Sequence, residues 1–578
     1  MHVFSTSFIK TLSILSLLTL FFSCKKISNF KQSVANHEYS TFFWFNYQGN
    51  DDTFKSFSKS DDSYINPILT GFYPDPSICY ANGKFYLINS SFSYFPGIPI
   101  FESTDLVNWK QLGHVITRKE QADFSGLKVS KGMFAPTIRY HYDTFYVICT
   151  NVEASGNFIV TAKNPAGPWS DPILLPEVEG IDPDLFFDDD GKVYITHNGV
   201  PPNNISKHEG HRAIYMFEYD LENKKVIGES TLLVNGGTSM DIKPVWVEAP
   251  HIFKKDGYYY LICAQGGTGN NHSEVVFRSK SVSGPYVSYE NNPILTQRHL
   301  DANRPNEISS TGHADFIELP NGDWWTVFLG CRPYEGDLYN TGRETFLMPL
   351  AWENDWPKVV GGKTPITVLH KKPNLPVSQE ATTPTTGNFV FHDDFNEDTL
   401  DFKWNFIRTP LEAWYKLDGN NLLIKPRTES IHTKTNYSFI GRRQQHLQFE
   451  ASTKLSYTVT DTLKTAGLVA FQNEDFYLLI GKRLNKDGNV EVYLEKNAGP
   501  VDASKPSIIE KKELNENTED LFLKVEGDKR FYNFYYKTQE NDPWILLGNT
   551  IDASILSTNK AGGFVGTYLG MYTSLNHF

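Results

Sequence analysis

The chain has 578 residues, of which 40% are hydrophobic and 21% charged, and its formal net charge is −13. At about 100–200 residues per domain, this length predicts two to four domains. Its 41 Gly and 31 Pro are too few for a collagen-like or mostly disordered chain. The negative charge argues against nucleic acids and anionic membranes as partners and favours a neutral one. Aromatic residues make up 14% of the chain, which suits β-strands and flat ligands.

The N-terminal segment has the pattern of an export signal. Lys10 precedes an apolar run over residues 11–22, which ends in Ser23-Cys24. This run is too short to span a bilayer but suits the apolar core of a signal peptide. A small residue before a cysteine resembles a bacterial lipoprotein cleavage box. We therefore expect a signal peptide over residues 1–23, lipidation of Cys24, and export to the bacterial periplasm or outer membrane, with the lipid as the only membrane contact; the alternative is an ordinary signal peptide cut nearby.

A polar tether and then a repeated pattern follow. Residues 24–61, rich in Ser, Asn, Lys and Asp, predict the tether, although residues 41–47 are too apolar to be linker throughout. Repeated strand-only units are typical of a β-propeller, so we predict a five-bladed propeller over residues 62–375. Each of its five units has a short strand, a polar turn and a longer aromatic strand, and opens with one of these motifs: Asp75-Pro-Ser-Ile, Ala135-Pro-Thr-Ile, Asp182-Pro-Asp-Leu, Ala249-Pro-His-Ile and His313-Ala-Asp-Phe.

The second domain is also predicted to consist of strands. Residues 376–388 are small, polar and Pro-containing, which indicates a linker. Residues 389–578 alternate apolar and polar positions without the five-fold pattern, so we predict a β-sandwich. The fold class is therefore all-β. The cysteines beyond the signal show no CxxC spacing and are expected to be buried free thiols: Cys79, Cys149, Cys263 and Cys331.

The opening motifs are predicted to bring carboxylates together. In a propeller the innermost strand of each blade lines the central channel, so Asp75, Asp182, Glu248 and His313 should converge near the axis. Carboxylates that are buried near one another repel, which raises at least one pKa and provides a proton donor near neutral pH. One protonated and one ionised carboxyl group are the minimal machinery for glycoside hydrolysis. The alternatives are structural: Asp-Pro is a common turn dipeptide, and His313 suits a hydrogen-bonded core histidine.

Six ordered motifs identify a family resemblance. The chain resembles family 43 glycoside hydrolases, in particular their β-xylosidase and α-L-arabinofuranosidase group. The resemblance covers residues 65–375 and continues at Phe391-His-Asp-Asp-Phe and Trp404, like the concanavalin-like β-sandwich appended to these β-xylosidases. The motifs are Asn66-Pro-Ile-Leu-Thr-Gly-Phe-Tyr-Pro-Asp75-Pro-Ser, Phe95-Pro-Gly-Ile-Pro-Ile-Phe, Gly180-Ile-Asp182-Pro-Asp-Leu-Phe, Glu248-Ala-Pro-His, Gly312-His313-Ala-Asp and Gly342-Arg343-Glu-Thr-Phe-Leu.

The resemblance implies a role for each carboxylate. Asp75 is expected to be the general base that activates water, and Glu248 the general acid that protonates the leaving oxygen. Asp182 is expected to hold the acid in position and raise its pKa. Family members invert the anomeric configuration, so the Asp75 and Glu248 carboxyls are expected about 6.5–9.5 Å apart, with room for a water.

The resemblance also implies the residues that bind the sugar. Arg343 is expected to bind sugar hydroxyls. Phe134, with Phe92 or Phe95, is expected to form an apolar wall, and a loop of the sandwich is expected to help close the pocket. His313 corresponds to a channel histidine that in some relatives holds a water network or a calcium ion. No metal site is assigned with certainty, and hydrolysis requires no cofactor.

The predicted function is therefore exo-acting, inverting glycoside hydrolysis. We expect release of terminal xylose or arabinose from neutral plant hemicellulose oligosaccharides, with β-xylosidase activity as the first choice. The first alternative is an α-L-arabinofuranosidase with the same three carboxylates. The second is a glycan-binding lipoprotein without activity, which predicts the loss of at least one carboxylate, and none is lost.

Overall fold

The computed structural model describes residues 38–57, 60–376, 384–499, 506–515 and 518–577. The predicted signal peptide, Cys24 and most of the predicted linker lie outside these residues. No helix in the described part of the chain is long and apolar enough to cross a membrane. The short helical turns are α1 (Asp52–Lys55), η1 (Pro202–Asn204), η2 (Met240–Ile242), η3 (Ser554–Leu556) and α2 (Thr558–Ala561).

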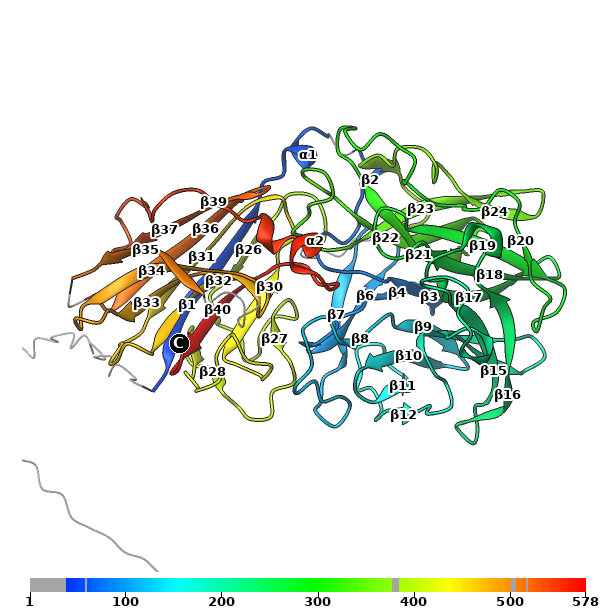
Figure 1. Ribbon diagram of the computed structural model, residues 1–578, viewed down its shortest axis with the longest axis horizontal. Helices are drawn as coiled ribbons and strands as arrows, with labels where there is room; N and C mark the ends of the chain where they lie inside the picture. The colour runs from blue at the N-terminus through cyan, green and yellow to red at the C-terminus, as the bar shows by residue number, and fades with distance from the viewer. Residues whose placement is uncertain (1–37, 58–59, 377–383, 500–505, 516–517, 578) are drawn as a thin grey trace, which may run out of the picture. The chain divides into compact units, whose positions relative to one another are not determined.

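The first domain is a propeller of five antiparallel sheets, as predicted (Figure 1). The blades are β3 (Ser77–Ala81), β4 (Lys84–Ile88), β6 (Gly97–Ser103) and β7 (Lys110–Ile116); β8 (Gly132–Met133), β9 (Thr137–His141), β10 (Thr144–Val152), β11 (Gly156–Ala162) and β12 (Ile173–Leu174); β13 (Ile181–Phe187), β14 (Val193–Gly199), β15 (Ala213–Asp220) and β16 (Lys225–Asn235); β17 (Glu248–Lys255), β18 (Tyr258–Gln265), β19 (Ser273–Ser279) and β20 (Val287–Ser288); and β21 (Ser309–Glu318), β22 (Trp324–Cys331), β23 (Glu344–Glu353) and β24 (Trp356–Val359).

The innermost strands β3, β9, β13, β17 and β21 contact one another in ring order, and β21 contacts β3 to close the ring. The closure is polar: the Asp315 carboxylate accepts hydrogen bonds from the Ser77 hydroxyl (2.7 Å) and the Ile78 N–H (3.0 Å). Second strands such as β14 and β22 are buried along their whole length. Neighbouring blades cover both of their faces, which explains the continuous apolar runs of these strands.

The second domain is the predicted β-sandwich of two antiparallel sheets. Strand β31 places buried and partly exposed residues in near alternation because one face of its sheet packs in the core, whereas β32 and β40 of the other sheet are buried almost throughout. One sheet holds β28 (Tyr415–Leu417), β29 (Leu422–Ile424), β1 (Ser40–Gly49), β31 (Gln448–Ser456), β36 (Asp520–Asp528), β37 (Phe531–Lys537) and β38 (Ile545–Leu546), with β26 (Val390–Asp393) and β39 (Ile551–Asp552) at its side; the other holds β35 (Ser507–Glu513), β34 (Val490–Ala498), β33 (Phe476–Leu484), β32 (Thr465–Asn473), β40 (Tyr568–Ser574), β30 (Phe439–Arg443), β27 (Asn405–Ile407) and β5 (Tyr94–Phe95).

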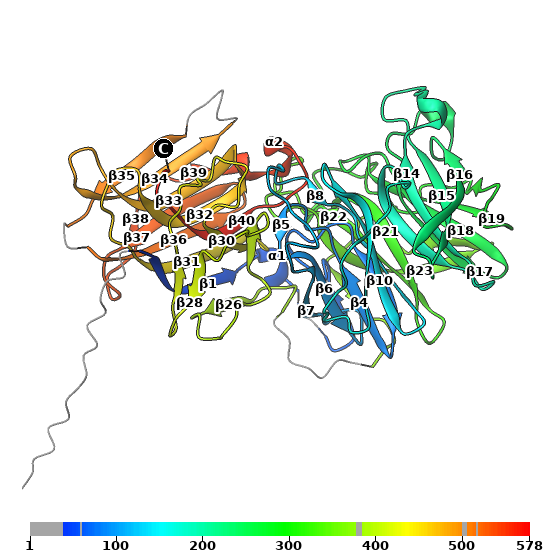
Figure 2. The same cartoon turned by 90° about the horizontal axis from the view of Figure 1, so that it is seen from below.

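Two segments lie in domains other than those expected. Part of the predicted tether over residues 24–61 is strand β1, which pairs with β31, β29 and β26 inside the sandwich (Figure 2). The tether prediction was wrong here because alternate residues of β1, including Phe45 and Tyr47, are fully buried in the sandwich core. Strand β5 belongs to the propeller by sequence but pairs with β27 of the sandwich.

Smaller contacts join segments at the ends of the propeller sequence. Strand β2 (Ser63–Ile65) pairs with β25 (Leu369–Lys371), which brings the two ends of the propeller sequence together. Of the predicted linker 376–388, residues 377–383 lie outside the described part. Beyond them, the hydroxyls of Thr385 and Thr386 donate to the carbonyls of Ile68 and Pro67. The four cysteines predicted as buried free thiols are confirmed as such.

Candidate active site

Four of the five repeated motifs open with a residue whose backbone is kinked in the same way. Asp75, Asp182, Ala249 and His313 have φ angles of 51°, 56°, 51° and 55°. Strands β13, β17 and β21 also shift register against their neighbours beside the kink. Residues other than glycine adopt this left-handed region at a cost of about 1–3 kcal/mol, and such strain is common at functional sites.

A cavity of about 300 Å³ lies at these kinks. It brings together the three predicted catalytic carboxylates and four of the five predicted sugar-binding residues. Six further residues, five of them on the propeller, had no predicted role. The full lining is Asp75, Phe92, Phe134, Ala135, Ile181, Asp182, Trp246, Glu248, Gly267, Thr268, His313, Arg343 and Phe564.

Phe95 is the predicted wall residue that does not line the cavity. It lies on β5, pairs with Phe406 of β27 and belongs to the main hydrophobic core. Phe564 of the sandwich lines the cavity instead. Its ring stacks on Phe92 (centroids 5.9 Å apart) and meets Phe134 edge-on (5.8 Å). The expected sandwich contribution is therefore present, and these three rings form the apolar wall.

Asp75 is held as an ionised carboxylate. Arg343 donates to Asp75 Oδ1 at 2.8 Å, and the Ser90 hydroxyl donates to Oδ2 at 2.6 Å. Burial opposes ionisation, but Arg343, His313 and Ser90 outweigh it and lower the pKa of Asp75. An ionised carboxylate facing a cavity can accept a proton from water.

Glu248 has the opposite environment. It is the first residue of β17 and is buried, and its carboxyl has no hydrogen bond to the described part of the protein. Burial, followed by repulsion from Asp182 and Asp75, raises the pKa of Glu248 well above its ordinary value. The raised pKa favours the protonated form of Glu248, which can donate its proton.

Asp182 is the third carboxyl group of the cavity. Its Oδ2 accepts a hydrogen bond from the Ala249 N–H at 3.2 Å, next to Glu248 in the chain. Burial and the charge of Asp75 raise the pKa of Asp182 to about 7. Because the charge of Asp182 also raises the pKa of Glu248, it can keep the acid protonated.

His313 does not offer a calcium site. Its Nδ1 lies 3.6 Å from Asp75 Oδ1, and that carboxylate is already paired with Arg343. Burial lowers the pKa of His313 to about 3, so the imidazole is neutral. Calcium takes about six to eight oxygen ligands, and the described residues place His313 in no group of three metal-ligating side chains. The residues around His313 therefore do not fit the calcium ion that the resemblance allowed.

A layer of paired charges connects four of the innermost strands next to the cavity residues. Asp184 and Asp315 follow Asp182 and His313 by two residues on the same strands. Arg139 of β9 pairs with both carboxylates, at 3.0 Å and 2.8 Å, and His251 Nδ1 lies 3.2 Å from Asp184. We name these four residues the plug. These four residues have no role predicted from the sequence, although the two-residue spacing in Asp182-Pro-Asp and His313-Ala-Asp places both acids on the channel face.

The chain is similar to known proteins along most of its length. Residues 64–357 match the family model of glycosyl hydrolases family 43, and residues 392–577 match the β-xylosidase C-terminal concanavalin A-like domain. A xylosidase/arabinosidase of Butyrivibrio fibrisolvens is 41% identical over 88% of this chain and 96% of its own length. A non-reducing end α-L-arabinofuranosidase of Bacteroides ovatus is 36% identical over 90% of this chain and 93% of its own.

Solved structures extend the likeness to three dimensions. The crystal structure of a GH43_12 protein retrieved from a capybara gut metagenome has a TM-score of 0.86 and 40% identity, over 93% of this chain and 99% of that one. Two domains, in the expected order, are thus shared along nearly the whole length. The chain belongs to glycosyl hydrolases family 43 and carries the β-xylosidase C-terminal concanavalin A-like domain.

Proposed function

We propose that this glycoside hydrolase is exo-acting and releases terminal pentose residues from neutral oligosaccharides. The observation that carries the proposal is the pair of opposite carboxyl environments in one cavity. Asp75 is held ionised by Arg343, and Glu248 is held protonated by burial and repulsion. Two titratable groups whose pKa values are driven apart are the signature of an acid and a base in one active site.

The proposed reaction is a single displacement. The Asp75 carboxylate takes a proton from water, and the oxygen of that water bonds to the anomeric carbon. On the opposite side of the sugar the glycosidic bond breaks, and Glu248 gives its proton to the departing oxygen. The sugar leaves with its anomeric configuration inverted, Asp75 protonated and Glu248 ionised, and proton exchange with solvent restores both groups. No step in this reaction requires a metal or another cofactor.

The shape of the cavity supports attack at a chain end. Phe564 of the sandwich walls the cavity together with Phe92 and Phe134. A cavity of about 300 Å³, at the low end of ligand sites, suits one terminal sugar rather than a long stretch of polymer.

The pentose is proposed to be β-xylose first and α-L-arabinofuranose second. The two relatives above are named for xylosidase and arabinosidase activities. The test compares kcat/KM on 4-nitrophenyl β-xylopyranoside and 4-nitrophenyl α-L-arabinofuranoside, followed by NMR of products from arabinoxylan oligosaccharides. Release of single pentoses with inverted configuration supports the proposal. Activity on neither glycoside, or cleavage within the chain, contradicts it.

We also propose that the protein is an exported lipoprotein. The support is the pattern of Lys10, the apolar run 11–22 and Ser23-Cys24. Bacteria that express the gene are fed a fatty acid carrying a chemical tag, and the protein is then tested for label. The wild type and Cys331→Ser, which alters a buried thiol, should be labelled, and Cys24→Ser should not. An unlabelled wild type contradicts the proposal.

A further inference from the structure

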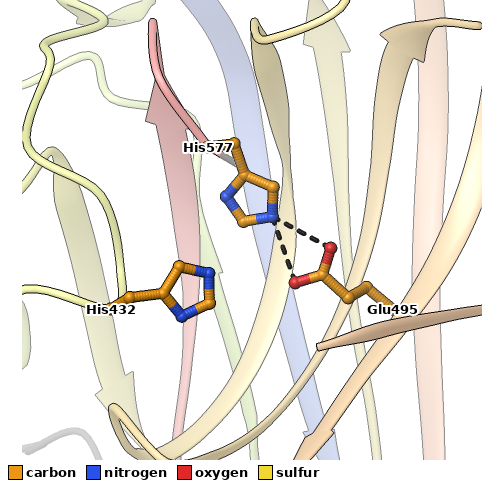
Figure 3. Close-up of side chains that lie close together, drawn as sticks. All are labelled: His432, Glu495 and His577. Atoms are coloured by element: carbon orange, nitrogen blue, oxygen red, sulfur yellow. Dashed lines mark hydrogen bonds and ion pairs between the residues drawn. The ribbon is translucent and has the colours of Figure 1, made fainter. Parts of the chain in front are cut away.

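A second group of chemically reactive side chains lies in the sandwich. His432 is on the segment between β29 and β30, Glu495 is on β34, and His577 follows β40. One potential ligand atom from each lies within 4.8 Å of the others. Figure 3 shows the two imidazoles and the carboxylate pointing toward one another. Within the described ranges, no other three His, Cys, Asp or Glu residues meet in this way.

The carboxylate is at the centre of the group. Both Glu495 oxygens lie 3.1 Å from His577 Nε2. The Tyr477 hydroxyl donates to Glu495 Oε1 and lies 3.3 Å from His432 Nε2. Glu495 and His577 are almost completely buried. Charged groups are expensive to bury unless they are paired or bind a metal.

The second ring nitrogen of His577, Nδ1, also has a hydrogen-bond partner. Its Nδ1 lies 3.1 Å from the Tyr572 hydroxyl, and that hydroxyl accepts the Ile431 N–H at 3.1 Å. A histidine that binds a metal through one nitrogen commonly has its other nitrogen fixed in this manner, which sets the tautomer and the ring orientation. The Tyr572 contact thus orients Nε2 toward Glu495 and His432.

His432 supplies an entry path, because it is the partly exposed member of the group. Its Nε2 lies on the side of the ring that faces the Tyr477 hydroxyl and Glu495 (Figure 3). A metal could therefore reach the buried Glu495–His577 pair past the edge of this imidazole.

We propose that His432, Glu495 and His577 form a zinc site. Two imidazole nitrogens and one carboxylate are a known three-ligand set for Zn²⁺ and leave the fourth position to water or to Tyr477. A site with this much nitrogen does not suit Ca²⁺ or Mg²⁺, which prefer oxygen ligands throughout. On binding, the metal takes the place of the proton that His577 Nε2 shares with Glu495, and that proton passes to solvent.

The proposed metal has a structural role. The three ligands come from β34, from the segment before β30 and from the segment after β40, which are far apart in sequence and meet on one sheet. A metal that binds the folded chain and not the unfolded one raises stability by mass action. None of the three residues lines the active-site cavity, so zinc should raise the melting temperature and leave kcat unchanged.

The test uses the full chain, freed of metal by a chelator and titrated with ZnCl₂ by calorimetry. The key variant is His432→Ala, because His432 is at the edge of the group and its loss leaves the buried Glu495–His577 pair in place. The matched control is His392→Ala, an exposed histidine of the same domain. We expect one zinc per chain in the wild type and in the control. In H432A the affinity should fall about 100-fold or more, since residues that only orient ligands already change it by about 10- to 100-fold.

Two further readings separate this site from incidental binding. Zinc should raise the melting temperature of the wild type and of H392A but not of H432A, and CaCl₂ should raise none of them. Co²⁺ in place of zinc should give the visible absorption of a four-coordinate site only when His432 is present. Failure of the wild type to bind zinc, or equal binding by the wild type and H432A, overturns the proposal.

Discussion

Two layers of charged side chains occupy the propeller channel, and they differ in how their charges are balanced. In the plug, Asp184 and Asp315 share Arg139, and His251 approaches Asp184 as well. In the cavity, three carboxyl groups lie near Arg343, which pairs with Asp75 alone among them. Both layers are buried, so the contrast comes from pairing and not from exposure.

The difference separates a structural layer from a reactive one. The plug acids have a positively charged partner, Arg139, which connects neighbouring blades. The unpaired acid Glu248 cannot ionise cheaply, because burial and two nearby carboxylates oppose its charge. The same scaffold thus produces a plug of paired charges and, close to it, a proton donor, and each of the following changes should affect one layer in its own way.

The largest expected effect is the loss of activity on replacing the acid. Glu248→Gln should reduce kcat/KM on a xylo-oligosaccharide by about 10²–10⁴-fold, the usual contribution of general acid catalysis. The control is Glu179→Gln, the same change at an exposed position near the cavity, which should keep wild-type activity. E248Q should melt no lower than the wild type, because the glutamine removes the cost of burying an ionisable group. Full activity in E248Q contradicts the assignment.

Breaking the plug should cost stability. Asp184→Asn leaves Arg139 and His251 without one partner, and loss of one member of a buried ion pair costs roughly 3–5 kcal/mol in the free energy of unfolding. The comparison is Asp171→Asn, which removes an exposed pair with Arg118 and should cost less than about 1 kcal/mol. Denaturant unfolding measures both. An equal cost for the two variants means that the plug does not hold the blades.

Replacing Asp182 should shift the pH dependence of kcat/KM. Activity requires protonated Glu248, so the rate falls as pH rises through its pKa. The charge of Asp182 raises that pKa; Asp182→Asn should therefore lower it and shift the alkaline limb of kcat/KM to lower pH. The acid limb belongs to Asp75, whose pKa is lowered, and should stay in place. The E179Q control should keep both limbs, and an unmoved alkaline limb in D182N shows that Asp182 does not tune the acid.

The smallest expected effect concerns the sandwich wall. Phe564→Ala removes the ring that packs on Phe92 and Phe134, so KM for a xylo-oligosaccharide should rise about tenfold, as for the loss of part of an apolar contact. Phe531→Ala, at a half-exposed ring of the same domain, should leave KM unchanged. Steady-state kinetics on both variants decide whether the sandwich takes part in substrate binding.

Much of the fold could be predicted from the sequence, because the propeller signal is repeated. Five copies of one motif indicated five blades, and their opening residues indicated which side chains meet at the axis. Strand β1 was assigned to a tether, since its partners β26, β29 and β31 lie hundreds of residues away. The local sequence of a single apolar strand does not indicate which sheet the strand joins.

The site residues that stand in the quoted motifs could be predicted from the sequence, and those outside the motifs could not. Asp75, Asp182, Glu248 and Arg343 stand in the quoted motifs and line the cavity together. Phe564 stands in no such motif, and its role follows from the packing of the sandwich against the apolar wall. Phe95 does stand in a motif, yet its strand pairs with that of Phe406, and its side chain lies in the hydrophobic core. The His432, Glu495 and His577 group likewise depends on distant strands that meet in space.

The most direct test of the acid and base assignment compares leaving groups. Dinitrophenolate departs without a proton, so Glu248→Ala should keep near wild-type kcat on 2,4-dinitrophenyl β-xylopyranoside while losing activity on xylobiose. Asp75→Asn should lose activity on both substrates, because water still needs a base. Equal losses on the two substrates in E248A, or a D75N enzyme that remains active on either, would contradict the account.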